Sequence, residues 1–308
     1  MELRIVCDSS SNTYELEGAD YRCVPLTVTL DGEDYADVEN LNLDNFYAAM
    51  SLCNGPSTTS CPSPSIWLKA YEGADRVLAI TLSSRLSGSY NTAQLAASEY
   101  TEQNSEAEVA VLDSRSAGEE LVLLAQEAQR LATSDEGYSL SQIIERLHEY
   151  RKHTHVLFTL SDLSHLARNG RINPALARFA HTLDIHILGT GNTEGMIEIL
   201  RKCRGQKKAL RAGIREIQLH HYTGKKLYIS HVQNEAGAYT LEHALREVWP
   251  EADITIQPCH ALCSYYANLG GLIVSYVDSK TAPKHPIDQM SLPNLPINPL
   301  HLMKDDSE

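Results

Sequence analysis

Two short segments rich in hydroxyl side chains are the parts of this chain best suited to bind a small ligand. One follows the turn at Asn54–Pro56, the other follows the apolar run Arg76–Leu82, and each leads into a predicted helix. A helix start offers unpaired N–H groups and a positive dipole end, so with hydroxyl donors it suits an anion. The alternative is that these serines only cap helices. The candidate ligand residues are Thr59, Ser60, Ser87, Gly88 and Ser89.

Apolar runs of strand length alternate with amphipathic segments of helical period along the chain. Predicted strands are Leu3–Cys7, Cys23–Leu30, Arg76–Leu82, Glu108–Asp113, His155–Leu160, Met196–Leu200, Lys226–Val232, Asp253–Gln257 and Gly271–Val277. This alternation predicts an α/β fold with mainly parallel sheets flanked by helices. Ligands of open parallel sheets bind beyond the carboxyl ends of the strands, and the segment after Arg76–Leu82 falls at such an end.

Composition excludes several classes of function. The chain has 308 residues and a formal net charge of −14, which disfavours nucleic acid and anionic membrane surfaces as partners. No apolar run is long enough to span a membrane, so we expect no membrane insertion and a cytoplasmic location. The seven cysteines are scattered, which indicates a reducing compartment. A zinc site at Cys259, His260 and Cys263 is an alternative that lacks an evident fourth ligand.

Two motifs carry a family resemblance. Residues 58–64 read TTSCPSP and residues 82–93 read LSSRLSGSYNTA. They are similar to the signature loops TSQPSP and LSSxLSGTYxSA of the DegV family of fatty-acid-binding proteins. The Asp-Ser-Ser after the first strand, and Arg168–Ile172 (RNGRI), similar to the family pattern GGRI, add to the resemblance.

The resemblance implies two α/β lobes, residues 1–152 and 153–277, with the ligand site between them. The proline content of residues 278–308, by contrast, predicts a Pro-rich tail extension that is longer than the family usually needs. It implies that a long-chain fatty acid is the ligand, with no other cofactor, and that the chain is a non-catalytic carrier. Thr59, Ser60, Ser87, Gly88 and Ser89 would bind the carboxylate, and Arg171 would add positive charge. The implied partner is the catalytic subunit of a fatty acid kinase, met by a monomer or a homodimer of this chain.

The chain departs from the family near its last predicted strand. Family members carry H-x-G-P-G there, whereas residues 258–271 read PCHALCSYYANLGG. Spacing to the final strand puts Cys263 at the position of the family histidine, and His260 lies one helical turn earlier, so we expect His260 to substitute for it. This corner of the site therefore predicts an altered contact with the ligand head group.

Two other functions are consistent with the same residues. A serine hydrolase with Ser87 as nucleophile would need a nucleophile elbow, but Arg85–Ser89 lacks the first glycine of G-x-S-x-G. A binder of a small polar or phosphorylated metabolite would use the same loops. Since the chain has no P-loop motif, we do not expect it to use ATP independently.

Overall fold

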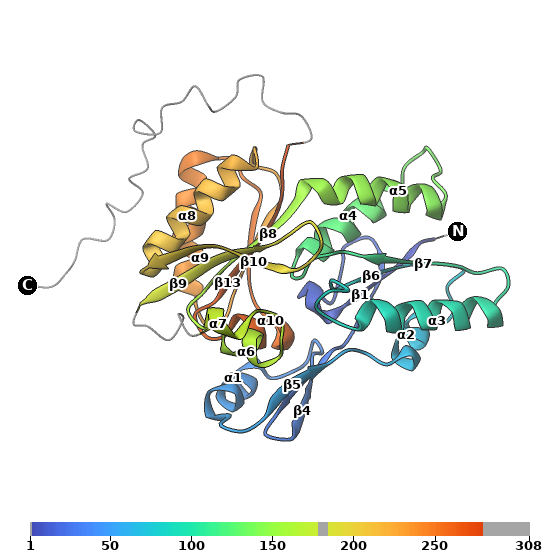
Figure 1. Ribbon diagram of the computed structural model, residues 1–308. Helices are drawn as coiled ribbons and strands as arrows, with labels where there is room; N and C mark the ends of the chain where they lie inside the picture. The colour runs from blue at the N-terminus through green and yellow to red at the C-terminus, as the bar shows by residue number, and fades with distance from the viewer. Residues whose placement is uncertain (1, 178–183, 280–308) are drawn as a thin grey trace, which may run out of the picture.

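The first sheet is fully parallel, as the alternation of strands and helices predicts. The structure is a computed structural model that describes residues 2–177 and 184–279. All neighbouring strands of this sheet pair in parallel, so their carboxyl ends meet at one edge of the sheet (Figure 1). Its strands, in order across the sheet, are β2 (Asp20–Val24), β1 (Arg4–Asp8), β6 (Arg76–Thr81) and β7 (Glu108–Asp113).

Helices cover both faces of the parallel sheet because the strand side chains alternate between two apolar cores. Val6 and Val77 pack with Trp67 on one face, whereas Ile5 and Leu78 belong to the core on the other. The first core contains α2 and α3 and the second contains α4 and α5, and together with the sheet they form what we call the first lobe. The bounds are α2 (Pro64–Tyr71), α3 (Ser89–Gln103), α4 (Glu120–Ala132) and α5 (Leu140–Tyr150).

The second large sheet has six strands and is mainly antiparallel. Only β11 and β12 run parallel among its neighbouring pairs; the other four pairs are antiparallel. The α/β class is thus confirmed, but the prediction of mainly parallel sheets is wrong for this sheet. A turn over residues 192–196 joins β9 and β10 as a hairpin, and a hairpin forces antiparallel pairing. The order across the sheet is β10 (Ile197–Arg204), β9 (Ile185–Gly191), β8 (Thr154–Leu160), β13 (Leu272–Val277), β11 (Leu227–His231) and β12 (Ile254–Pro258).

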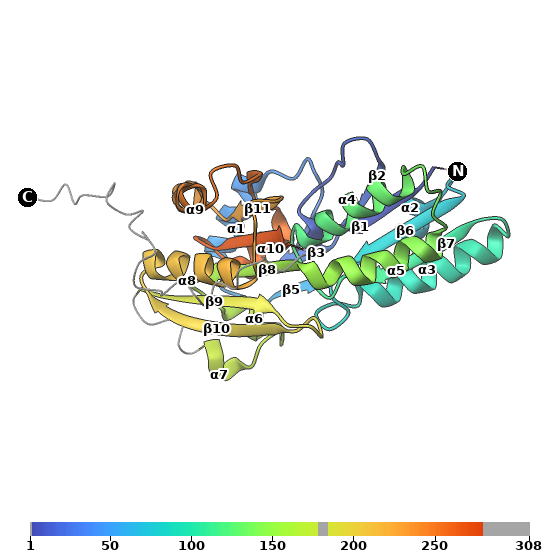
Figure 2. The same ribbon diagram turned by 90° about the horizontal axis from the view of Figure 1, so that it is seen from above.

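The two faces of this second sheet pack against different layers. Helices α8 (Gln206–Leu219) and α9 (Glu235–Val248) bury one face, where Leu157, Ile214 and Leu241 share a core. Shorter helices occupy the other face, and we call this sheet with its helices the second lobe. The two large sheets lie side by side along the molecule (Figures 1 and 2). The short helices are α6 (Ser164–Arg168), α7 (Pro174–Ala177) and α10 (Ala261–Ala267).

A third, small sheet covers the short helices of the second lobe. The predicted strand Cys23–Leu30 is divided after Val24 between two different sheets, where Pro25 has no N–H to continue a strand ladder. Residues 57–60, predicted as a loop, form a strand instead. Helix α10 lies between the six-stranded sheet and this small sheet (Figure 1). The elements are β4 (Glu33–Ala36), β3 (Thr27–Leu30), β5 (Ser57–Ser60) and helix α1 (Leu43–Leu52).

One apolar core joins the small sheet to the second lobe. Val28 and Phe46 pack in the same cluster as Leu160 and Tyr265, so residues of the first part of the chain complete a core of the second. The division into lobes at residue 152 stays a prediction, and the predicted extension over 278–308 lies outside the described residues beyond Ser279. No helix in the described part of the chain is long and apolar enough to cross a membrane.

Two buried glutamates at the start of α4 connect the two lobes. Glu119 accepts hydrogen bonds from Asn12 at 2.8 Å and from Gln257 at 3.0 Å, and Glu120 accepts one from Thr154 at 2.6 Å. Burial raises the pKa of Glu120 to about 7, although hydrogen bonds and the nearby Arg151 favour the charged form. The junction thus holds a carboxyl group that changes its protonation near neutral pH.

We predict that Glu120→Gln removes a pH-dependent part of the stability. An unfolded glutamate titrates near 4.5 and folded Glu120 near 7, so between these values the folded state binds more protons. The contribution of Glu120 to the free energy of unfolding therefore falls as the pH rises through that range, by roughly 3 kcal/mol in total. Urea unfolding of the wild type and of Glu120→Gln from pH 5 to pH 8 measures the difference between their free energies of unfolding at each pH. A difference that stays constant with pH would contradict the prediction.

Candidate functional site

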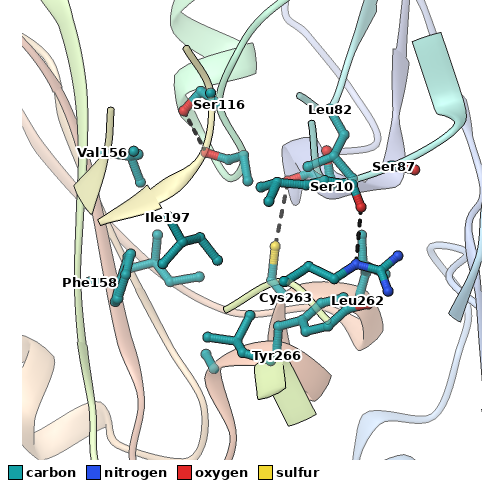
Figure 3. Close-up of a pocket in the computed structure, with 18 of the residues that line it drawn as sticks. Ser10, Leu82, Ser87, Ser116, Val156, Phe158, Ile197, Leu262, Cys263 and Tyr266 are labelled. Atoms are coloured by element: carbon teal, nitrogen blue, oxygen red, sulfur yellow. Dashed lines mark hydrogen bonds between the residues drawn. The ribbon is translucent and has the colours of Figure 1, made fainter. Parts of the chain in front are cut away.

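A largely apolar cavity lies where the first lobe, the small sheet and the second lobe meet. The volume of this cavity is about 120 Å³. Ser10 and Ser87 line one side, and Val156 and Phe158 of β8 line the opposite side (Figure 3). The cavity is therefore polar at one end and apolar at the other, as a ligand with a polar head and an apolar tail requires.

Thr59 and Ser87 bring the two predicted hydroxyl segments to the same cavity. Thr59 stands in β5 and its Oγ1 lies 2.7 Å from the hydroxyl oxygen of Tyr266. Ser87 lies in the loop between β6 and α3, where its Oγ accepts a hydrogen bond of 3.2 Å from the N–H of Ser89. This bond uses a lone pair of Ser87, so its O–H stays available as a donor.

Ser89 does not line the cavity but stabilises the loop that carries Ser87. Its side chain is fully buried and its hydroxyl donates to Asp8 Oδ2 at 2.5 Å. The same oxygen accepts the Leu82 N–H at 2.8 Å, and Oδ1 accepts the Ser10 hydroxyl at 2.5 Å. Burial raises the pKa of Asp8, while these hydrogen bonds favour its charged form. Asp8 thus connects the turn after β1 to both ends of the loop between β6 and α3.

Arg171 lines the cavity beside these hydroxyls. Its Nε donates to the carbonyl oxygen of Leu86 at 3.1 Å, which connects it to the loop of Ser87. The guanidinium carbon lies 5.9 Å from the ring centre of Tyr266. The left-handed conformation of the preceding turn belongs to Gly170, at φ 72°, and not to Asn169, at φ −92°. Asn169 instead donates to the hydroxyl of Tyr265 at 2.8 Å.

Besides Ser89, three predicted residues do not line the cavity. Ser60 is exposed because it follows Thr59 in a strand, where neighbouring side chains point to opposite faces. Gly88 is exposed at the start of α3. His260 precedes α10, and its ring packs against Tyr14 with ring centres 4.5 Å apart. Burial lowers the pKa of His260, so the ring is neutral at pH 7.

The residues that sequence reasoning missed are Tyr266, Arg115, Ser116 and Asp37. The first three line the cavity. Asp37 is fully buried behind it and accepts the N–H groups of Ala261 at 2.9 Å and Leu262 at 3.1 Å, so it caps α10. No local sequence signal identifies these residues, because Asp37 and α10 lie more than 200 residues apart in the chain.

The arrangement bears on two chemical alternatives. The described residues that line the cavity include no histidine that could serve Ser87 as the imidazole base of a serine hydrolase. Cys263 lines the cavity, and burial raises its pKa well above the usual range, which keeps the thiol protonated. Within residues 2–177 and 184–279, no group of three or more His, Cys, Asp or Glu side chains is arranged to hold a metal ion.

Fold and cavity together define an α/β protein with a largely apolar cavity between its lobes. Residues 2–278 match the family model described as "Uncharacterised protein, DegV family". This chain belongs to the DegV family, which confirms the resemblance carried by the two loop motifs. A DegV domain-containing protein from Streptococcus pyogenes serotype M3 is 36% identical over 270 residues, which cover 88% of this chain and 96% of the relative.

Two solved structures share the fold over nearly their whole length. A DegV family protein from Eubacterium eligens, loaded with heptadecanoic acid, has a TM-score of 0.86 and 32% identity, with 90% of this chain and 100% of that chain covered. The fatty acid kinase (Fak) B3 protein of Streptococcus pneumoniae, loaded with linoleic acid, has a TM-score of 0.86 and 33% identity, with 91% and 100% covered.

We predict that Asp8→Asn destabilises the protein more than Ser89→Ala does. Asparagine presents an NH₂ group where a carboxylate oxygen accepts hydrogen bonds, so buried donors of Leu82 and Ser89, or of Ser10, lose their partner. An unsatisfied buried donor costs about 1–3 kcal/mol, whereas Ser89→Ala removes one donor and leaves the Leu82 bond in place. Urea unfolding at pH 7 measures both losses. Equal stability of Asp8→Asn and wild type would disprove the role of Asp8.

Proposed function

We propose that this protein binds one long-chain fatty acid, with the acyl chain in the cavity and the carboxylate at its polar end. The observation that carries the proposal is the apolar cavity that ends at Thr59, Ser87 and Arg171. Family members of the same fold are described with heptadecanoic and linoleic acid bound. The fit of a cavity with one polar end to such ligands favours a fatty acid over a small polar metabolite.

The two ends of the ligand would contribute differently to binding. Each buried methylene contributes about 0.8 kcal/mol, so a 16-carbon chain gives a gross gain of roughly 12 kcal/mol, from which association and ordering subtract several kcal/mol. Hydroxyl and guanidinium donors make the stronger, charge-assisted hydrogen bonds to a carboxylate. The tail therefore supplies most of the affinity, and the donors fix the orientation of the head.

This chain would act as a carrier that presents the bound acid to the catalytic subunit of a fatty acid kinase. The similarity to the B3 protein of the fatty acid kinase of Streptococcus pneumoniae supports this role. In that reaction a carboxylate oxygen of the acid attacks the γ-phosphate of ATP, and ADP leaves. Incubation of the loaded protein with a fatty acid kinase catalytic subunit and ATP should give an acyl phosphate, which hydroxylamine traps. No trapped product with an active kinase would refute the role as a presenting subunit.

We predict that the purified protein carries about one fatty acid, and that the cavity hydroxyls hold it. Native mass spectrometry, followed by lipid extraction, measures the amount. Thr59→Val and Ser87→Ala should each lower the bound fraction, because each removes a hydrogen bond to a charged group. Ser60→Ala is the matched control, since Ser60 is exposed and lies outside the cavity. A wild-type protein that stays free of lipid after incubation with C14 to C18 acids would rule out the proposed function.

We also predict that Phe158 and Gly189 set the acyl length. A Cβ on Gly189 would lie 2.3 Å from Cζ of Phe158 and 2.8 Å from the backbone carbonyl oxygen of Glu198 in β10. Gly189→Ala must therefore displace both the ring and this strand, on the face where the cavity lies. Phe158→Ala should shift the extracted acids to longer chains and Gly189→Ala to shorter ones. Gly213→Ala is the control, because its Cβ would meet Leu188 at an ordinary 3.7 Å on the other face of the sheet. Unchanged chain lengths in both cavity variants would contradict this prediction.

A further inference from the structure

Tyr266 lies at the polar end of the cavity, although no motif in the sequence identifies it as a ligand-binding residue. It stands near the end of α10, lines the cavity and lies below Ser10 and Ser87 in the close-up view (Figure 3). Its hydroxyl oxygen is 2.7 Å from Oγ1 of Thr59, and its ring lies beside the guanidinium of Arg171, 5.9 Å from ring centre to Cζ. One side chain therefore contacts two of the three residues expected to bind the head group.

The hydroxyl groups of Thr59 and Tyr266 together can still donate one hydrogen bond to a ligand. Of the two O–H groups of Thr59 and Tyr266, one donates to the other, and the second remains free to donate elsewhere. Burial raises the pKa of Tyr266, so its hydroxyl keeps its proton at neutral pH. A carboxylate has only acceptor oxygens, and a neutral hydroxyl pair next to a guanidinium is a complementary donor set.

Contacts on both sides of the residue hold Tyr266 in place. Asp37 caps the start of α10, and the neighbouring Tyr265 stacks on His165 with ring centres 4.2 Å apart. The hydroxyl of Tyr265 donates to Ser57 Oγ at 2.8 Å, away from the cavity. Because α10 is fixed at its start and along its length, the hydroxyl of Tyr266 is preorganised toward Thr59.

We propose that Tyr266 is a head-group residue, whose hydroxyl acts with Thr59 and Arg171 as a donor to the carboxylate of the ligand. This inference rests on the proposed function and goes beyond it, because it assigns the altered corner of the site to a tyrosine. His260, the residue expected there from the sequence, packs against Tyr14 outside the cavity. Cys263 lines the cavity, but its thiol donates to the carbonyl of Ser10 at 3.5 Å.

The test compares binding of palmitic acid and of 1-hexadecanol, which have the same chain and different heads. Tyr266→Phe should weaken binding of the acid roughly tenfold, as expected for one hydrogen bond to a charged group, and should leave the alcohol nearly unchanged. Tyr71→Phe is the matched control: it also removes a buried tyrosine hydroxyl, but one that donates to the carbonyl oxygen of Ala93 in the first lobe, outside the cavity, and it should keep the wild-type ratio of the two affinities. Titration of delipidated protein by isothermal calorimetry gives these ratios.

The remaining arms separate this inference from the proposed function. Thr59→Val removes the same hydroxyl pair from the other side, so it should lower the same ratio even where Tyr266→Phe folds poorly. A wild-type ratio in Tyr266→Phe, or an equal loss for acid and alcohol, would overturn the role of Tyr266 while fatty acid binding stands. If the wild type binds neither the acid nor the alcohol, the proposed function falls, and this inference falls with it.

Discussion

The buried carboxyl group of Asp8 is the contact on which the geometry of the cavity depends. Its oxygens accept hydrogen bonds from the turn after β1, from the end of β6 and from the start of α3, the last of these 81 residues away in the chain. A buried carboxylate is tolerated only when such donors surround it, so these bonds also fix where the donors lie. With Ser89 held beneath the loop, Ser87 is left to face the cavity.

A second set of long-range polar contacts places the opposite wall. Asn12 accepts the N–H of His260 and Asp37 accepts those of Ala261 and Leu262, so residues of the first part of the chain fix the start of α10. Helix α10 has only seven residues, so the position of its start determines which way its side chains point. This is why the hydroxyl of Tyr266 reaches Thr59. The site is therefore built from strands and loops of three sheets, and no single segment contains it.

Local patterns in the sequence predict the part of this site that depends on local structure. Hydrophobic periodicity and helix starts predict the order strand, hydroxyl loop, helix over residues 76–103, and the structure has Ser87 of this loop beside the cavity. The loop motif predicts that Thr59 and Ser60 bind the ligand together, but they lie in β5, where neighbouring side chains point to opposite faces. The sequence around Tyr265 and Tyr266 does not show which of the two side chains points into the cavity. The distant Asp37 determines this, because it binds the N–H groups at the start of α10. The direction of the strands in the second sheet depends on the return path of the chain, which alternation does not encode.

The placement of titratable groups separates ligand contact from structural support. The thiol of Cys263 and the hydroxyl of Tyr266, which line the cavity, stay protonated at neutral pH because burial raises the pKa of each group. Two carboxyl groups with raised pKa values lie outside the cavity lining. Burial raises the pKa of Asp37, which caps α10, to about 6, and that of Glu120, which joins the lobes, to about 7. A change of pH therefore acts first on the contacts that hold the walls of the cavity together. Because Asp37 fixes the start of α10, which carries Tyr266, a change of pH reaches the site through the orientation of its donors.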